Sequence, residues 1–146
     1  MKNIKYVSID IASSLASIKA DIMYMPFRDN VFDCIICYRV LEFIDDDKKA
    51  MAELLRVLKP SGWAMLQSLL DYNKEMTFEP ENPEQVFPRN DPVKRIYGRD
   101  YQKKLESAGF IVKPDTFAME RGMIFIKRYG LVGKEIVYYC TKSSNE

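Results

Sequence analysis

Apolar and polar residues alternate in short runs over the first third of the chain. Residues 4–11 (IKYVSIDI) alternate in this way, which predicts a strand that ends in an acid at Asp10. Residues 15–23 (LASIKADIM) predict a short second strand that ends at Asp21. Residues 32–40 (FDCIICYRV) are apolar on both faces, as expected for a strand that is covered from both sides in a parallel sheet.

After this strand the spacing of the apolar residues becomes that of a helix. Between Asp45 and Gly62, apolar residues recur every three or four positions, and Pro60 and Gly62 are expected to end the helix. A strand is predicted over 63–70 (WAMLQSLL). Because this helix joins two strands, the strands should be parallel and the connection right-handed.

The second half predicts a long excursion and then a return to the sheet. Residues 71–100 are rich in Pro, Glu, Asn and aromatic side chains, and loops of this length are usually functional or disordered. A helix follows over 99–110, closed by Gly109, and residues 111–117 and 135–142 predict two closing strands that are antiparallel neighbours. We expect one α/β domain over 1–146 with a Rossmann-like, mostly parallel sheet, helices on both faces and an antiparallel closing strand.

Composition narrows the class of protein. The chain has 146 residues, 22 Lys and Arg against 21 Asp and Glu, and interspersed charges, so no basic face for nucleic acid is expected. Three cysteines and the lack of an apolar signal region indicate a cytoplasmic location. No apolar run approaches the roughly 20 residues of a membrane span, so no membrane partner is expected.

The cysteines do not predict a metal site. Cys34 and Cys37 form a C-x-x-C, but residues three apart on a strand point to opposite faces, and Cys140 is the only other thiol. We expect all three to be core thiols. Phe27 and Phe32 are likewise expected to pack in the core.

Several polar side chains should gather at one rim of the sheet. In open α/β sheets ligands bind outside the carboxyl ends of the strands, where Asp10, Asp21 and residues 37–39 fall. One acid there can accept from ribose hydroxyls and another from an exocyclic amine, a combination that suits a nucleoside. Each acid taken alone is equally compatible with a solvated or helix-capping carboxylate, and Asp33 is expected only to hold its own turn.

Together these segments resemble the class I S-adenosylmethionine-dependent methyltransferases, and within them the type 11-like domain. The resemblance covers roughly residues 4–112. Its marks are the order of an acid, Pro-Phe and Phe-Asp over 21–33, V-L-E at 40–42, R-V-L-K-P-x-G at 56–62, and Y-G-x-D-Y-x-x-x-L-x-x-A-G-F at 97–110.

The resemblance implies S-adenosylmethionine as the cofactor and assigns residues to it. Asp10 would hold the ribose hydroxyls, and Asp21 with the amide of Ile22 would hold adenine. Cys37 and Tyr38 would lie near the methionine part and the departing methyl group. Residues 71–100 could form a lid over the acceptor or an irregular excursion.

Two departures from the family matter. This chain has no glycine-rich turn of the kind with which the family begins, since its glycines all come at Gly62 or later, so the resemblance implies a sheet that is incomplete at its N-terminal strand. Either residues 4–11 and 32–40 pair directly, or a homodimer mate or other partner covers the open edge.

The second departure concerns the acceptor side. Relatives often carry histidine around V-L-E, whereas this chain has Arg39 and Phe43 there and no histidine anywhere. Glu42, Asp71 and Tyr38 could replace a histidine base where the acceptor must lose a proton. Arg39, Glu42 and Asp71 are therefore the expected acceptor residues, and no catalytic residue is assigned.

Two functions remain open. The first is a methyltransferase for a small molecule or sugar rather than nucleic acid. The second is a truncated or non-catalytic relative that acts through binding or a partner. A different nucleotide-binding module is disfavoured because the chain has no G-x-x-x-x-G-K-[ST] loop.

Overall fold

A computed structural model describes residues 3–83, 87 and 93–143. Its elements in chain order are β1 (Ile9–Asp10), β2 (Ile18–Lys19), η1 (Ile22–Tyr24), β3 (Phe32–Tyr38), η2 (Leu41–Phe43), α1 (Asp47–Val57), β4 (Leu58–Gln67), α3 (Tyr101–Ser107), β5 (Phe110–Asp115), α4 (Met123–Tyr129) and β6 (Val137–Lys142). Within these residues no helix is long and apolar enough to cross a membrane.

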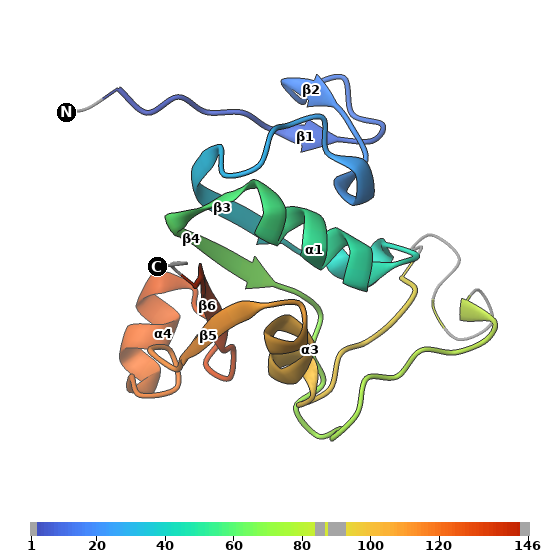
Figure 1. Cartoon of the computed structure of the whole chain (residues 1–146). Helices are drawn as coiled ribbons and strands as arrows, with labels where there is room; N and C mark the ends of the chain where they lie inside the picture. Colours follow the sequence, from blue (N-terminus) through green and yellow to red (C-terminus); the bar gives the residue numbers. More distant parts are fainter. Residues whose placement is uncertain (1–2, 84–86, 88–92, 144–146) are drawn as a thin grey trace.

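Four strands form the main sheet in the order β3-β4-β6-β5 (Figure 1). β3 is parallel to β4, while β6 is antiparallel to both β4 and β5, so β3, β4 and β5 run in one direction. The α/β class, the mostly parallel sheet and the antiparallel closing strand are therefore confirmed. The carboxyl ends of β3, β4 and β5 lie at the same edge of the sheet, which is called the rim below.

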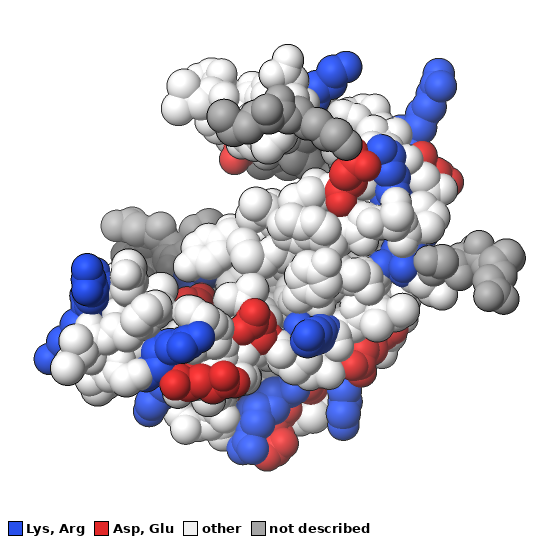
Figure 2. All heavy atoms as spheres, turned by 90° about the vertical axis from the view of Figure 1, so that its left-hand side faces the viewer, with Lys and Arg blue, Asp and Glu red and all other residues white. Residues whose placement is uncertain are grey.

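The first two strands form a separate parallel pair. Hydrogen bonds from Ile18 N to Ser8 O and from Ala20 N to Asp10 O, both 3.0 Å, join β1 to β2. Among the described residues neither strand pairs with β3, so the structure does not have the first of the two alternatives, direct pairing of residues 4–11 with 32–40. Figure 2 shows a hollow between this upper part of the molecule and its body.

α1 forms because its sequence supplies a cap and an apolar stripe. Asp46 accepts a hydrogen bond from Lys49 N at 3.0 Å, which satisfies one of the free amides of the first turn. Buried positions of α1 recur at helical spacing and face the core: Ala50, Met51, Leu54 and Val57.

The end of α1 differs from the prediction. The helix stops at Val57, and β4 already begins at Leu58 rather than at residue 63. A Cβ on Gly62 would lie 2.9 Å from Asp33 O, so the two strands approach too closely for a side chain there. Gly62 is thus a position of close strand contact, not a helix stop.

α1 and α3 cover one face of the sheet. Ala64 and Cys140 on this face belong to the core cluster together with Leu54 of α1 and Leu105 of α3. A Cβ on Gly109, which has φ +106°, would lie 2.7 Å from the Leu55 side chain, so α1 and the end of α3 are neighbours.

The opposite face differs from the prediction, because it carries exposed apolar side chains. The paired rows Cys34–Trp63 and Ile36–Met65–Tyr139 lie on it, and all of these except Met65 are exposed. In the described part of the chain β3 is therefore not covered from both sides, and Cys34 is an exposed thiol rather than a core one. Cys37 and Cys140 are buried as predicted.

The 71–100 excursion and α4 are the two later segments that the sequence described least well. Phe78 pairs with Ile96 and Leu70 with Tyr97, so both ends of the 71–100 excursion are held against the body. Its residues 84–86 and 88–92 lie outside the described residues. α4, between β5 and β6, was not predicted.

Candidate functional site at the rim of the sheet

The turn after β3 is the clearest irregularity of the rim. Arg39 has φ +58°, a left-handed conformation that non-glycine residues adopt rarely and at a cost. Its amide is fixed by a hydrogen bond to Gln67 O at 2.9 Å, which extends the pairing of β3 with β4 by one residue. This strained turn leads from β3 directly into η2, which contains Glu42.

Glu42 is a buried carboxylate with two polar neighbours. Its side chain is 0% exposed, Arg39 Nε lies 2.8 Å from Oε1, and Ser68 Oγ donates a short hydrogen bond to Oε2. The Arg39 side chain is 39% exposed, so the ion pair links a buried charge to solvent. Burying a carboxylate without such partners would cost several kcal/mol.

Gln67, the last residue of β4, has a buried side-chain acceptor without a partner in the described part of the chain. Gln67 Nε2 donates to Glu135 Oε1 at 3.2 Å, but Gln67 Oε1 has no hydrogen bond among the described residues. Glu42 Oε1 also lacks a hydrogen bond of good geometry despite its distance to Arg39. Tyr38, at 56% exposure, ends β3 beside them. Unsatisfied buried acceptors in this position fit a site that receives donors from a ligand.

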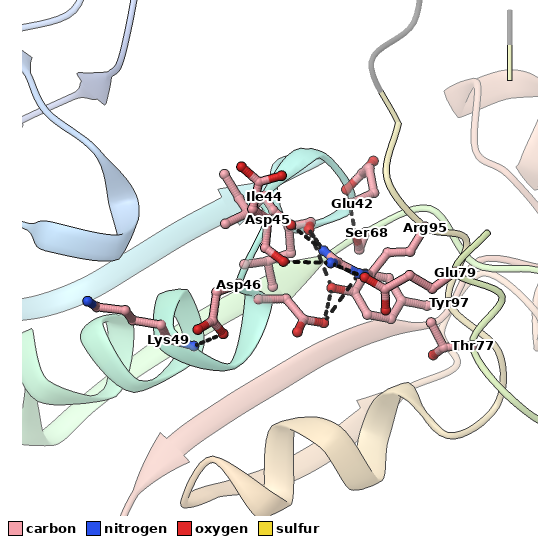
Figure 3. A network of polar contacts seen from close by, with 12 residues as sticks. Glu42, Ile44, Asp45, Asp46, Lys49, Ser68, Thr77, Glu79, Arg95 and Tyr97 are labelled. Carbon is pink, nitrogen blue, oxygen red and sulfur yellow. Dashed lines mark hydrogen bonds and ion pairs between the residues drawn. The ribbon is translucent and has the colours of Figure 1, made fainter. Parts of the chain in front are cut away.

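A second polar network, centred on Arg95, fixes the segment between β3 and α1 (Figure 3). Arg95 is 1% exposed and donates to the carbonyls of Leu41, Ile44 and Asp45, which are the last residues before α1. Tyr97 Oη donates to Asp47 Oδ2 at 2.8 Å. Burial, and next the Asp47 carboxylate, raise the pKa of Tyr97 well above its usual range. Tyr97 therefore stays protonated and acts as a fixed donor.

Sequence reasoning missed most of this support. Ser68, Gln67 and Arg95 were not singled out, although Arg95 and Tyr97 lie in or beside the Y-G-x-D-Y module. A polar pair at the end of an apolar strand, as in Gln67 and Ser68, is the signal that could have found two of them.

Cys37 is buried, whereas Asp71 is half-buried in a loop. Cys37 is buried against the core, and burial followed by the charge of Glu42 raises the pKa of its thiol to about 12. Its side chain thus stays a neutral thiol, and a contact with a ligand would fall to its backbone. Asp71 lies in the loop after β4, where Oδ1 accepts from Asn73 N at 3.0 Å and its amide donates to Tyr97 O.

The two predicted nucleoside acids each use one carboxylate oxygen locally. Asp10 Oδ1 accepts from Ala12 N and Ser13 N at 2.8 and 2.7 Å, and these bonds lower the pKa of Asp10. Asp21 Oδ1 accepts from Met23 N at 2.8 Å and caps η1. Asp21 therefore has the helix-capping role considered from the sequence, whereas Asp10 holds a turn. Among the described residues the second carboxylate oxygen of each acid makes no hydrogen bond.

The position of Asp21 is fixed by α1. Met25 N donates to Glu53 Oε2 at 2.9 Å, and Arg56 Nη1 donates to Phe27 O at 2.8 Å. Ile22 is buried, so its backbone is held beside Asp21. Asp10 ends β1 and Asp21 follows β2, so both acids lie at the carboxyl ends of this parallel pair.

Comparison with known proteins relates the chain to methyltransferases. The family described as "Methyltransferase domain" matches residues 2–66. The "Ubiquinone/menaquinone biosynthesis C-methyltransferase UbiE" of Saccharophagus degradans is 32% identical over 112 residues, which is 77% of this chain and 39% of that protein. The chain is therefore similar to the class I S-adenosylmethionine-dependent methyltransferases. It spans well under half the length of this curated relative.

Solved structures of methyltransferases have the same fold. The Burkholderia thailandensis 1,6-didemethyltoxoflavin-N1-methyltransferase, solved with S-adenosylhomocysteine, has a TM-score of 0.63 at 11% identity over 93% of this chain and 60% of that one. A Haloferax volcanii putative methyltransferase, in complex with the Trm112 methyltransferase activator, has a TM-score of 0.59 at 16% identity over 86% and 60%. At these identities the likeness shows the fold alone.

Proposed function

We propose that this chain carries the rim of an S-adenosylmethionine-dependent methyltransferase that methylates a carbon of a small, apolar acceptor. The observation that carries the proposal is the buried, hydrogen-bonded pair of Glu42 and Ser68 behind the partly exposed Arg39 at the carboxyl ends of β3 and β4. The similarity to a quinone C-methyltransferase supports a carbon acceptor.

The residues that would hold the cofactor are those predicted from the sequence. Asp10 would accept from the ribose hydroxyls, and Asp21 with the Ile22 amide would bind adenine. Tyr38 and the backbone of Cys37 would face the methionine part. When bound, S-adenosylmethionine supplies a reactive methyl group, and the protein contributes alignment of the acceptor and exclusion of water.

Carbon methylation also requires removal of one proton. A ring carbon that gains a methyl group must lose its hydrogen as a proton, and a neighbouring hydroxyl is most nucleophilic when ionised. Arg39 would stabilise such an oxyanion, because its guanidinium is partly exposed and is held in place by Glu42. Glu42 or Asp71 would take the proton.

The proposal also assigns roles to the 71–100 segment and to the open edge of the sheet. Residues 71–83 and 93–100 would form part of a lid over the acceptor, and a second copy or partner would cover the open edge of β3 and the face with Trp63 and Tyr139. The Haloferax relative in fold, which binds an activator, supports a partner. A monomer by light scattering at high concentration would contradict this part.

The test is methyl transfer from labelled S-adenosylmethionine to an alkyl-substituted hydroquinone with a free ring carbon. Arg39→Ala should lower the transfer rate at saturating cofactor by about 100-fold or more, the scale of one lost oxyanion contact. Arg28→Ala, on an exposed arginine outside the site, is the matched control. Binding of S-adenosylhomocysteine without any transfer would favour the non-catalytic alternative.

A further inference from the structure

α4 is an apolar helix that the core does not use. Five of the seven residues in MIFIKRY are apolar, yet none of the seven is buried. Helices of globular proteins bury an apolar stripe, and large exposed apolar patches usually mark an interaction site. The surrounding segment, residues 117–134, is called the docking segment here.

The outward side of α4 combines apolar and basic side chains. Met123 and Lys127, and likewise Ile124 and Arg128, are four residues apart and so point to the same side of the helix. Met123 is 65% exposed and Ile124 86%. Phe125 turns the other way, with its ring centroid 4.5 Å from that of Tyr129 and 5.9 Å from that of Phe117. The segment thus has a small core of its own and an amphipathic outer side.

The docking segment carries an excess of positive charge. It contains the basic residues Arg121, Lys127, Arg128 and Lys134 and one acid, Glu120, a net charge of +3 in a chain whose total is +1. Figure 2, which faces the side where α4 lies in Figure 1, shows basic and acidic side chains among uncharged surface over its lower half. Basic residues beside exposed apolar ones match an anionic bilayer surface, into which Met and Ile insert while Lys and Arg reach the headgroups.

The docking segment is attached to the rim. Directly after it, Glu135 Oε1 accepts from Gln67 Nε2 at 3.2 Å, and Ile136 N donates to Tyr72 Oη at 3.0 Å. β5 and β4 both end at this edge. A surface on which the docking segment rests would therefore lie next to the proposed acceptor site.

We infer that the docking segment binds the surface of an anionic lipid bilayer and so presents the rim to an acceptor dissolved in the membrane. The acceptor part of this inference rests on the proposed function, but the binding itself does not. It revises the expectation of no membrane partner, which was based on the length of apolar runs, because surface docking needs no spanning helix.

The test is co-sedimentation with phosphatidylcholine vesicles that contain or lack phosphatidylglycerol. The wild type should bind the anionic vesicles, and binding should weaken with salt and be at least tenfold weaker without phosphatidylglycerol. Lys127→Glu with Arg128→Glu should reduce binding about tenfold or more, and so should Ile124→Ser. Arg28→Glu with Lys103→Glu makes the same charge change on exposed residues elsewhere and should have a smaller effect.

Three results would overturn the inference. These are no binding to anionic vesicles, equal loss in the control pair, or loss of self-association by light scattering in Ile124→Ser with vesicle binding unchanged, which would identify a second copy as the occupant. Titration of S-adenosylhomocysteine into the same variants separates the two proposals, because cofactor binding should be unchanged in all of them.

Discussion

Arg39 Nε lies 2.8 Å from Glu42 Oε1, and the arginine that makes this ion pair has φ +58°. The left-handed turn costs an L-residue roughly 1–2 kcal/mol. It also places the guanidinium between a fully buried carboxylate and solvent. Backbone strain at the end of a parallel strand is thus coupled to the charge of the proposed acceptor site.

Replacing Arg39 separates strain from charge. Arg39→Gly and Arg39→Ala both remove the ion pair, but only glycine relieves the positive φ. We expect the glycine variant to be more stable than the alanine variant by about 1 kcal/mol in urea denaturation. At Lys103, inside α3, the order should reverse, because glycine is a poorer helix former by about 1 kcal/mol. Alanine more stable than glycine at position 39 would show that the turn is not left-handed.

Arg95 should tolerate no other cation. Its guanidinium donates to three backbone carbonyls and to Glu79, a pattern that a single ammonium cannot reproduce. Arg95→Lys should lower the free energy of unfolding by about 2–3 kcal/mol. Arg99→Lys, on an exposed pair with Glu75, should change it by less than about 0.5 kcal/mol. Equal effects at both positions would contradict the network.

The three thiols should differ in reactivity. Cys34 is exposed, whereas burial raises the pKa of both Cys37 and Cys140 to about 12. With a disulfide reagent at pH 8, one thiol per chain should react rapidly in the folded protein and three in denaturant. Cys34→Ser should abolish the rapid phase. Rapid reaction of two or more thiols in the native protein would mean that the core face is open.

The contacts that Glu53 of α1 makes with Arg56 and with Met25 N, at the end of η1, should weaken in acid. The hydrogen bonds from Arg56 lower the pKa of Glu53 from its ordinary value of 4.5. Because the folded pKa is below the unfolded one, the stabilisation is complete above the unfolded value and is lost as the pH falls through the folded value. Glu53→Gln should therefore cost roughly 1 kcal/mol at pH 7 and progressively less below pH about 4.5. With Arg56→Met as background, this pH dependence should largely disappear.

The sequence predicted elements well where one period dominated. The strand at 32–38, the helix that starts at Asp47, Gly109 at a helix end and the antiparallel closing strands follow from patterning and turn chemistry. Apolarity on both faces of β3 did not guarantee burial on both, because burial depends on which helices the rest of the fold supplies. α4 was missed because its apolar residues lack a buried stripe.

The rim was only partly predictable. Arg39 was chosen because it follows a strand, and Glu42 because it stands in V-L-E, around which relatives carry histidine; the structure brings the two together. Gln67, Ser68 and Arg95 were not found, because their role depends on contacts between residues 25 or more positions apart. Pairing of that range is set by the tertiary fold rather than by local pattern.

The most direct test of the central claim is titration calorimetry of S-adenosylhomocysteine into the 146-residue chain and into Asp21→Asn. Asparagine can still accept from Met23 N and cap η1, but it replaces the second oxygen with an amide donor that cannot accept from adenine. Asp46→Asn is the matched control, since Asp46 also caps a helix by accepting from a backbone amide, that of Lys49. We predict binding in the micromolar range, about −8 kcal/mol, at least tenfold weaker in Asp21→Asn and unchanged in Asp46→Asn. Heat indistinguishable from buffer in the wild-type chain, or equal binding by Asp21→Asn, would contradict the account.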